Sequence, residues 1–360
     1  MSGYRAVDGM ARIKVIGVGG GGCNAVSRMY RERISGVEYV AMNTDSQALL
    51  QCDLPSHIKL GERLTRGLGV GGDPERGRMA AEESREDLVE TVRDTDMIFI
   101  AAGMGGGTVT GVAPVLAEIA KESEALTIGV VTRPFRFEGV HRRKAADDGI
   151  RRMREKVDTL LVIPNDRLLE MADENLTMEQ AFELADDVLR RGVQAIAELA
   201  TVPGDINLDF ADIKTIMTNA GPAWMAMGEA RGEGRAVEAA RAAINSPLLD
   251  VRIDGATGVL FNVTGGSDLT VKEVYEAAEA VRAAVDPDAN IIFGMATDLK
   301  LIDEVKVTLI ATGFPLRESN VDDDFDQLLK NDPQSHSLSD LEVPTFLRRQ
   351  ASPLRRGRLF

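Results

Sequence analysis

The sequence predicts an α/β protein, in which a mainly parallel sheet covered by helices is joined through one long helix to a smaller α+β domain. Three observations carry this prediction. Apolar runs of strand length alternate with helical patterns in the first half of the chain, a long apolar periodicity follows, and the second half orders its helices and strands differently. The 360 residues suffice for two domains of roughly 100–200 residues each.

The expected strands of the first half are short apolar runs. They cover residues 12–18, 37–42, 97–102, 127–132 and 159–163. Helical patterns separate most of them and cover residues 24–33, 74–92 and 113–124. Ligands of such parallel sheets bind at the carboxyl ends of the strands, and the glycine-rich turns of this chain occur there. We therefore expect the functional site at that edge of the sheet.

A single apolar face follows, built from residues that recur at spacings of three and four: Phe182, Ala185, Leu189, Val193, Ile196 and Ala200. Gly192 interrupts this pattern without ending it. We expect a central helix over residues 179–202, between a first domain at 12–178 and a second at 203–314. In the second domain the expected helices are 210–220, 235–245 and 271–285, and the expected strands are 258–264, 290–296 and 304–312. Residues 1–11 form an N-terminal extension.

The last forty-six residues differ in composition. Residues 315–342 contain eight acidic residues and two basic ones, which predicts a solvated linker over 315–340. Residues 341–350 place Leu341, Val343, Phe346 and Leu347 in a polar setting, which indicates either a short docking peptide or a chance cluster. The basic tail, 351–360, carries three arginines and no acid.

Composition and charge exclude several classes of protein. With 44% hydrophobic and 28% charged residues the chain is not disordered as a whole, and its net charge of −15 argues against nucleic acid as the main partner. Two cysteines and three scattered histidines predict neither a disulfide framework nor a zinc site. The uncharged stretch 97–117 contains five glycines before Pro114, so it reads as strand, loop and helix, not as a membrane span. We expect a cytoplasmic protein that does not insert into membranes.

Three glycine-rich loops are the strongest local signal. Residues 17–22 follow a strand, open a helix and contain GxGxxG, which by itself is weak evidence for a dinucleotide site. A nicotinamide-dependent enzyme would end its second strand with an acid about 20 residues on, but that strand ends in Asn43, Thr44 and Asp45, and Glu38 begins it. Further glycine loops at 67–72 and 103–107 suit a triphosphate, whose charge spreads over many oxygens. The GxxxxGK[ST] pattern is absent.

Together these motifs resemble those of the FtsZ family, the tubulin-like GTPases of bacterial cell division. The segments that carry the resemblance are GGGGCN at 19–24, NTD at 43–45, GGGTVTG at 105–111, RPFRFEG at 133–139 and NLDFAD at 207–212. It runs from about Ala11 to Phe314 and reappears between Leu341 and Arg349. The resemblance implies a tubulin/FtsZ-like fold whose first domain binds GTP or GDP.

The resemblance also implies roles for single residues. It implies that Gly20, Gly21, Gly22 and Asn24 contact the phosphates and nucleotide, that Gly71 and Gly72 form the γ-phosphate loop, and that Gly107 and Thr108 form the loop for the α- and β-phosphates. It also implies that Glu138 and Arg142 contact the ribose and phosphates, and that Asn165, Phe182 and Asp187 recognise guanine. An Asp accepts from guanine N1–H and the 2-amino group, and Phe can stack on the base. Without the resemblance, Phe182 reads as a core residue and Asp187 as a solvated helical acid.

The family's catalytic loop corresponds to Asn207, Asp209 and Asp212. Their spacing alone favours a helix N-cap followed by an acid in the first turn. The resemblance implies that they enter the nucleotide site of a neighbouring subunit and orient the attacking water, so that self-assembly activates hydrolysis of GTP to GDP and phosphate with Mg²⁺. It further implies head-to-tail filaments at mid-cell, and membrane-tethering and regulatory division proteins bound by the segment from Leu341 to Arg349. No protein ligands of a metal are expected.

Val109 is a departure from the family pattern, which has Gly at this position. Val would disrupt a left-handed backbone, but we expect Thr108 to be an N-cap and Val109 to begin the helix, where Val costs only a few tenths of a kcal/mol. Two alternatives to the active GTPase remain. One is a tubulin-like nucleotide-binding scaffold with little or no hydrolysis because of Val109, and the other is a nicotinamide-dependent oxidoreductase.

Overall fold

The computed structural model describes residues 11–32, 34, 36–171, 176–201, 210–248, 253–298 and 301–314. The chain divides into two compact units, Met1–Pro315 and Leu316–Phe360. The expected linker, docking peptide and basic tail lie outside the described residues, as do all but the last residue of the N-terminal extension.

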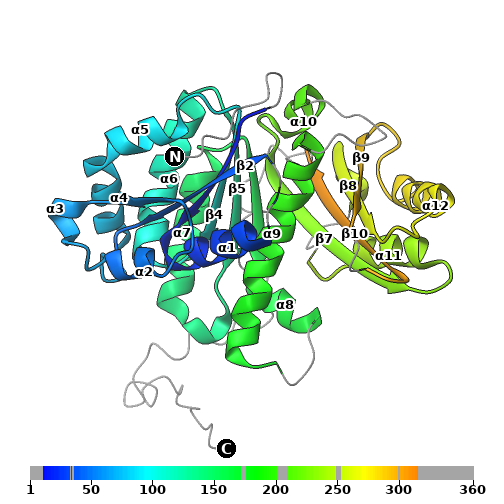
Figure 1. Cartoon of the computed structure of the whole chain (residues 1–360), viewed down its shortest axis with the longest axis horizontal. Helices are drawn as coiled ribbons and strands as arrows, with labels where there is room; N and C mark the ends of the chain where they lie inside the picture. Colours follow the sequence, from blue (N-terminus) through cyan, green and yellow to red (C-terminus); the bar gives the residue numbers. More distant parts are fainter. Residues whose placement is uncertain are drawn as a thin grey trace, which may run out of the picture. The chain divides into compact units, whose positions relative to one another are not determined.

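The strands of the first unit are β1 (Ile13–Val18), β2 (Val37–Asn43), β3 (Ser56–Lys59), β4 (Met97–Gly103), β5 (Leu126–Arg133), β6 (Thr159–Pro164), β7 (Gly221–Arg231), β8 (Gly258–Gly265), β9 (Asn290–Thr297) and β10 (Glu304–Thr312). They form one ten-stranded sheet in the order β3-β2-β1-β4-β5-β6-β7-β10-β8-β9 (Figure 1). All neighbours from β3 to β7 are parallel, whereas β10 runs antiparallel to β7 and β8. The predicted parallel sheet and smaller α+β part are confirmed.

Except for α7, which was not predicted from the sequence, the longer helices match the predicted regions with shifted ends. They are α1 (Gly19–Glu32), α4 (Pro74–Glu83), α5 (Arg85–Val92), α6 (Gly107–Glu122), α7 (Val140–Arg154), α9 (Met178–Thr201), α10 (Phe210–Met217), α11 (Arg235–Ile244) and α12 (Val271–Arg282); α2 (Ser46–Leu50), α3 (Glu62–Thr65) and α8 (Asn165–Met171) are short. The single helix expected over 74–92 is two helices, because the chain breaks at Ser84, whose Oγ accepts a hydrogen bond from Gly61 N at 3.0 Å.

The inner parallel strands β1, β4, β5 and β6 are buried on both faces, which explains their largely apolar sequences. In β4, Met97, Phe99 and Ala101 join a core cluster with α1 and α9, while Ile98 and Ile100 are buried toward the opposite face. The side chains of a strand alternate between the faces of its sheet, so each parallel strand contributes to both helix layers.

Strand β7 joins the two parts of the sheet. Residues Gly221 to Ala223 pair with β6, and the following residues, from Trp224 to Arg231, pair with β10. This strand was not predicted from the sequence, because its alternation is weak and it contains Gly228. That glycine is required by packing: a Cβ at position 228 would lie 2.0 Å from the carbonyl oxygen of Ala239 in α11.

The predicted central helix is α9, which lies between the parallel part and the antiparallel part of the sheet (Figure 1). It continues through Gly192, as expected. A Cβ at position 192 would meet Leu161 of β6 at 3.1 Å and Met225 of β7 at 3.3 Å, so the glycine lets α9 lie close against the sheet. No helix in the described ranges is long and apolar enough to cross a membrane.

Candidate functional site

Three glycine loops lie against one another at the carboxyl edge of the parallel strands. The first follows β1, the third follows β4, and a Cβ at Gly22 would lie 2.3 Å from Ala101 O. The second loop touches the third, since a Cβ at Gly107 would lie 2.5 Å from Asp73 N. Because side chains at these positions would separate the loops, glycine is what brings the three backbones to one place.

The same loops leave backbone groups available to an anion. No atom lies within 4 Å of the Cβ position of Gly20, Gly71 or Gly72, and the last two have φ of +65° and +82°, values that favour glycine. Helices α1 and α6 begin in the first and third loops with no acidic residue in their first turns, and the N-cap of α6, Gly106, has no capping side chain. Unpaired N–H groups at helix N-termini bind phosphate oxygens, so this edge fits a polyphosphate.

Thr108 and Val109 stand in the first turn of α6. The expected N-cap at Thr108 is wrong, since Gly106 is the N-cap, and the Thr108 hydroxyl instead lies 2.6 Å from Thr44 Oγ1 at the end of β2. The helical backbone expected at Val109 is confirmed, and its φ is not positive. Its side chain is buried against the first loop, 3.2 Å from the position that a Cβ on Gly19 would take.

Glu138 and Arg142 reach this edge from the segment after β5. The Glu138 carboxylate is nearly buried; it accepts from Phe135 N at 2.9 Å and pairs with Arg142 Nε at 3.1 Å. The main chain of Arg142 packs on the third loop, because a Cβ at Gly105 would lie 2.6 Å from Arg142 O. The structure therefore brings both residues beside the glycine loops.

Asn165 and Phe182 lie at the same side of the sheet. Asn165 opens α8 directly after β6, is 4% exposed, and its Oδ1 has no hydrogen-bond partner. An unpaired buried amide oxygen is costly, so this atom is free to accept a hydrogen bond from a ligand. The interpretation of Phe182 as a core residue is wrong: it is 42% exposed and lies edge-on to Phe135 and Phe137, at centroid distances of 5.6 and 6.2 Å.

Asp187 is engaged within its own helix. Arg190 and Arg191 donate to its two carboxylate oxygens at 2.7–2.8 Å. Burial alone would raise the pKa of Asp187, but these guanidinium groups hold it below its usual range. Asp187 follows Phe182 by five residues, so the two side chains do not share a face of α9.

Asp186 does share that face, and the sequence analysis missed it. It follows Phe182 by four residues, one helical turn, and that spacing was the available signal. Its carboxylate is mostly buried and lies 3.4 Å from Arg28 Nε of α1. Burial raises the pKa of Asp186 to about 7, although Arg28 opposes the shift.

The structure describes one of the three predicted catalytic residues. Asn207 and Asp209 lie outside the described residues, whereas Asp212 is exposed in the first turn of α10. Just after α10, Asn219 accepts a hydrogen bond from Lys121, at the end of α6, at 3.1 Å. Since α6 starts in the glycine loops and fourteen residues separate Gly107 from Lys121, this end of α10 lies roughly 20 Å from the loops, at the amino edge of the sheet.

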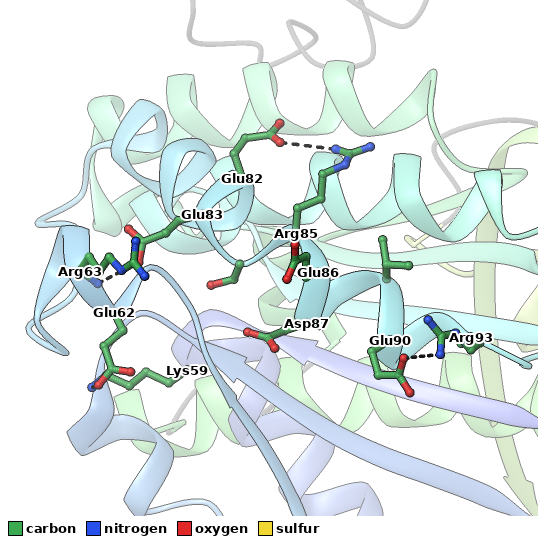
Figure 2. A pocket seen from close by; sticks show the side chains of 12 residues that line it. Lys59, Glu62, Arg63, Glu82, Glu83, Arg85, Glu86, Asp87, Glu90 and Arg93 are labelled. Carbon is green, nitrogen blue, oxygen red and sulfur yellow. Dashed lines mark hydrogen bonds and ion pairs between the residues drawn. The ribbon is translucent and has the colours of Figure 1, made fainter.

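A concave surface lies away from the glycine loops, along α3, α4 and α5 (Figure 2). This groove of about 1150 Å³ is lined by six acidic and four basic side chains, including the ion pair between Glu90 and Arg93. Mixed charges that pair with one another do not form an anion site, and the residues implied for nucleotide binding do not line it. Within the described ranges, no group of three or more His, Cys, Asp or Glu side chains is placed to hold a metal.

Comparisons with known proteins agree with this geometry. The family model of the Tubulin/FtsZ GTPase domain matches residues 12–173, and that of the FtsZ C-terminal domain matches 221–315. A solved structure described as an empty FtsZ dimer of M. jannaschii is 48% identical, with a TM-score of 0.82 over 84% of this chain and 88% of that chain. A solved structure of CetZ2 from Haloferax volcanii, described as a GTPgS-bound protofilament, shares the fold. It is 20% identical, with a TM-score of 0.73 over 92% of this chain and 100% of that chain. The two family models and the 48% identity thus place this chain in the FtsZ family of tubulin-like GTPases.

Proposed function

We propose that this protein binds GTP, assembles head to tail into filaments of the bacterial septal ring, and hydrolyses GTP to GDP and phosphate at the contact between stacked subunits. One observation carries the proposal. The glycine loops occupy the carboxyl edge of the sheet, whereas the helix that bears Asp212 is tied to the amino edge. Stacking one subunit on the next brings the two edges together.

The glycine loops hold the phosphates in this proposal. N–H groups around Gly20, Gly21, Gly22, Gly71, Gly72, Gly107 and Thr108 donate to phosphate oxygens, and Asn24, Glu138 and Arg142 contact the nucleotide from the sides. Bound Mg²⁺ would neutralise part of the phosphate charge. The absence of acids in the first turns of α1 and α6 supports the assignment.

Guanine is read beside Asn165 and Phe182. The exposed face of Phe182 supports stacking, and the unpaired Oδ1 of Asn165 supports a hydrogen bond to the base. For the acid that accepts from N1–H and the 2-amino group we favour Asp186 over Asp187, because both oxygens of Asp187 are already bound by arginines.

Catalysis is shared between subunits. Asn207, Asp209 and Asp212 of one subunit orient the attacking water at the γ-phosphate held by the next, by accepting its proton or holding a cation-bound water. A contact between two different surfaces is heterologous and repeats into an open filament. Self-assembly therefore activates hydrolysis.

The remaining assignments follow from the sequence. We propose a GTP-binding domain at 12–178, a central helix at 179–202, a second domain at 203–314, and an acidic linker that carries the docking peptide and basic tail. The protein acts in the cytoplasm at mid-cell, where the segment from Leu341 to Arg349 binds membrane-tethering and regulatory proteins. Deleting residues 341–360 should leave sedimentation and phosphate release intact and abolish binding to such partners; loss of GTP binding on deletion would contradict the linker boundary.

The test uses sedimentation and phosphate release with Mg²⁺ and either GTP or GDP. We expect pelleting and phosphate with GTP only. Asp212→Ala should bind GTP normally, release phosphate slowly and form persistent filaments, while Lys214→Ala, an exposed change on the same helix, should behave as wild type. GTP binding and assembly with no phosphate release by the wild type would establish the scaffold instead. Tight NAD binding without GTP binding would establish the oxidoreductase.

A further inference from the structure

A cluster of three charged side chains joins α1 to α9 beside the proposed guanine site. Arg28 Nη2 lies 2.9 Å from Glu183 Oε1, and Arg28 Nε lies 3.4 Å from Asp186 Oδ2. Arg28 follows Asn24 by four residues on α1, and Asp186 follows Phe182 by four residues on α9. The cluster therefore continues the same two helix faces that carry the nucleotide contacts.

The surroundings of Asp186 make its ionisation sensitive to its neighbours. Burial penalises the carboxylate, Arg28 from α1 favours it, and Glu183 from α9 disfavours it, which leaves the pKa near 7. The neighbouring charged side chains of α1 and α9 form ion pairs that do not include Asp186. Glu32 of α1 pairs with Arg190, and Arg190 and Arg191 also pair with Asp187. Arg28 is thus the cation in direct contact with Asp186.

Guanine recognition needs the ionised form of this acid. Guanine presents two donors, N1–H and the 2-amino group, and an ionised carboxylate is acceptor-only with one oxygen for each donor. A protonated carboxyl group carries one O–H donor. Its O–H group would face either N1–H or the 2-amino group of guanine, and these two donors cannot form a hydrogen bond with each other. The apparent affinity for GTP then scales with the fraction of protein in which Asp186 is ionised.

We propose that Arg28 is a positioning residue for nucleotide recognition, which holds the Asp186 carboxylate ionised and aimed at guanine, and that Glu183 opposes it by sharing the same guanidinium group. This inference rests on the proposed GTP site. It adds a residue pair, Arg28 and Glu183, that sets the affinity for guanine nucleotides and its dependence on pH.

The experiment measures GTP affinity of the full chain between pH 6 and pH 9 for the wild type, Arg28→Gln and Glu183→Gln. The phosphates titrate equally in all three proteins, so differences between the profiles report on the protein. Arg28→Gln should move the midpoint of the profile to higher pH, and Glu183→Gln should move it to lower pH. If the midpoint of the profile rises by one pH unit, from about 7 to about 8, the affinity for GTP falls about fivefold at pH 7. At pH 9 the affinity stays nearly unchanged.

Two further variants exclude a merely structural effect. Arg28→Lys keeps the cation and should restore most of the wild-type profile, and Arg31→Gln removes a guanidinium of the same helix that pairs with exposed Asp53, so its profile should match the wild type. If Arg28→Gln fails to fold, the downward shift in Glu183→Gln decides the question. Unchanged midpoints in the folded variants would overturn the proposal.

Asp186→Asn separates failure of this inference from failure of the guanine assignment. Xanthine carries a carbonyl where guanine has its 2-amino group, so an amide at position 186 should lower GTP affinity and raise affinity for xanthosine triphosphate. If that exchange occurs but the Arg28 and Glu183 midpoints do not move, the role of Arg28 is wrong and the site stands. If Asp186→Asn changes neither affinity, Asp186 does not read the base and the inference fails with it.

Discussion

Val109 tests whether a single departure from the family pattern impairs the phosphate site. Val109 has a helical backbone, so it carries no left-handed backbone strain, and its side chain packs on the first glycine loop. We expect Val109→Gly to change GTP affinity by less than about tenfold, or roughly 1.4 kcal/mol. The same change should lower stability by about 1 kcal/mol or more, because Gly weakens a helix and the buried contact is lost.

Calorimetric titration with GTP and thermal unfolding measure the two effects. Val109→Ala serves as the matched control, since it keeps the Cβ and favours the helix, but removes the methyl groups near Gly106. A gain in GTP affinity of about a hundredfold or more in Val109→Gly would show that the wild-type chain is an impaired binder, which would favour the scaffold function.

Asp186 should destabilise the nucleotide-free protein at neutral and alkaline pH. Its pKa is raised to about 7 in the folded chain, above its ordinary value, so the unfolded chain loses this proton first as the pH rises. The contribution of this group to stability is therefore complete below the ordinary pKa and is lost as the pH rises through about 7. Asp186→Asn buries no charge and should unfold at a higher temperature than wild type at pH 8, with little gain at pH 4.

Thermal unfolding without nucleotide, at several pH values, checks this prediction. Asp53→Asn is the matched control, because Asp53 is exposed and pairs with Arg31 at the surface. A gain in Asp186→Asn that stays constant from pH 4 to pH 8 would show that the carboxylate carries no burial penalty.

At the scale of helices and strands, the pairing of α4 with α6 depends on glycine. A Cβ at Gly111 of α6 would lie 2.2 Å from Pro74 O, and a Cβ at Gly77 of α4 would lie 2.3 Å from Gly107 O. Gly111→Ala should therefore push the helices apart at a cost of roughly 1–3 kcal/mol, and displace the second glycine loop from the third.

Denaturant unfolding measures this cost. Gly20→Ala is the matched control, because no atom lies within 4 Å of its Cβ position and its φ is not positive. The control should keep the wild-type free energy of unfolding. Equal stabilities of the two variants would mean that α4 and α6 do not need the close approach.

Elements with strong local patterns were predictable from the sequence, and those that depend on partners were not. Strand β10 was expected over 304–312 and runs over those residues, because it is rich in β-branched residues that favour strands. Strand β7 was missed because its alternation is weak and Gly228 interrupts it; the close approach of α11 that requires this glycine is a tertiary contact, which no local pattern records. Helix α1 starts five residues before the expected position, since glycines in a helix read as loop.

The candidate site divides in the same way. The three glycine loops could be recognised because each is a short segment rich in glycine, and the structure adds that they touch. The proposed base-binding side was harder to resolve from sequence, where Asp186 and Asp187 are adjacent and only the spacing from Phe182 favours Asp186. The contacts add a second distinction: Arg190 and Arg191 bind Asp187, and Arg28 reaches Asp186 from another helix.

For the whole molecule, the separation of the two half-sites predicts complementation between two inactive proteins. Asp212→Ala keeps its glycine loops, and Gly20→Asp keeps Asp212 but places a carboxylate among the phosphate oxygens, at a position with space for the side chain. Each variant alone should release phosphate slowly, the first for lack of the catalytic carboxylate and the second for lack of bound GTP.

An equal mixture of the two should regain activity. In a heterologous stack, an active contact forms wherever the glycine loops of an Asp212→Ala subunit meet the amino edge of a Gly20→Asp subunit. Because each side of a random contact has about one chance in two of being the required variant, at most about a quarter of the contacts are active. Phosphate release should therefore rise toward about a quarter of the wild-type rate as the mixture is concentrated, and adding Gly20→Asp,Asp212→Ala in place of Gly20→Asp should abolish the gain. Rates that merely sum those of the separate variants would mean that each subunit hydrolyses GTP with its own residues, because no contact would then supply what a single chain lacks.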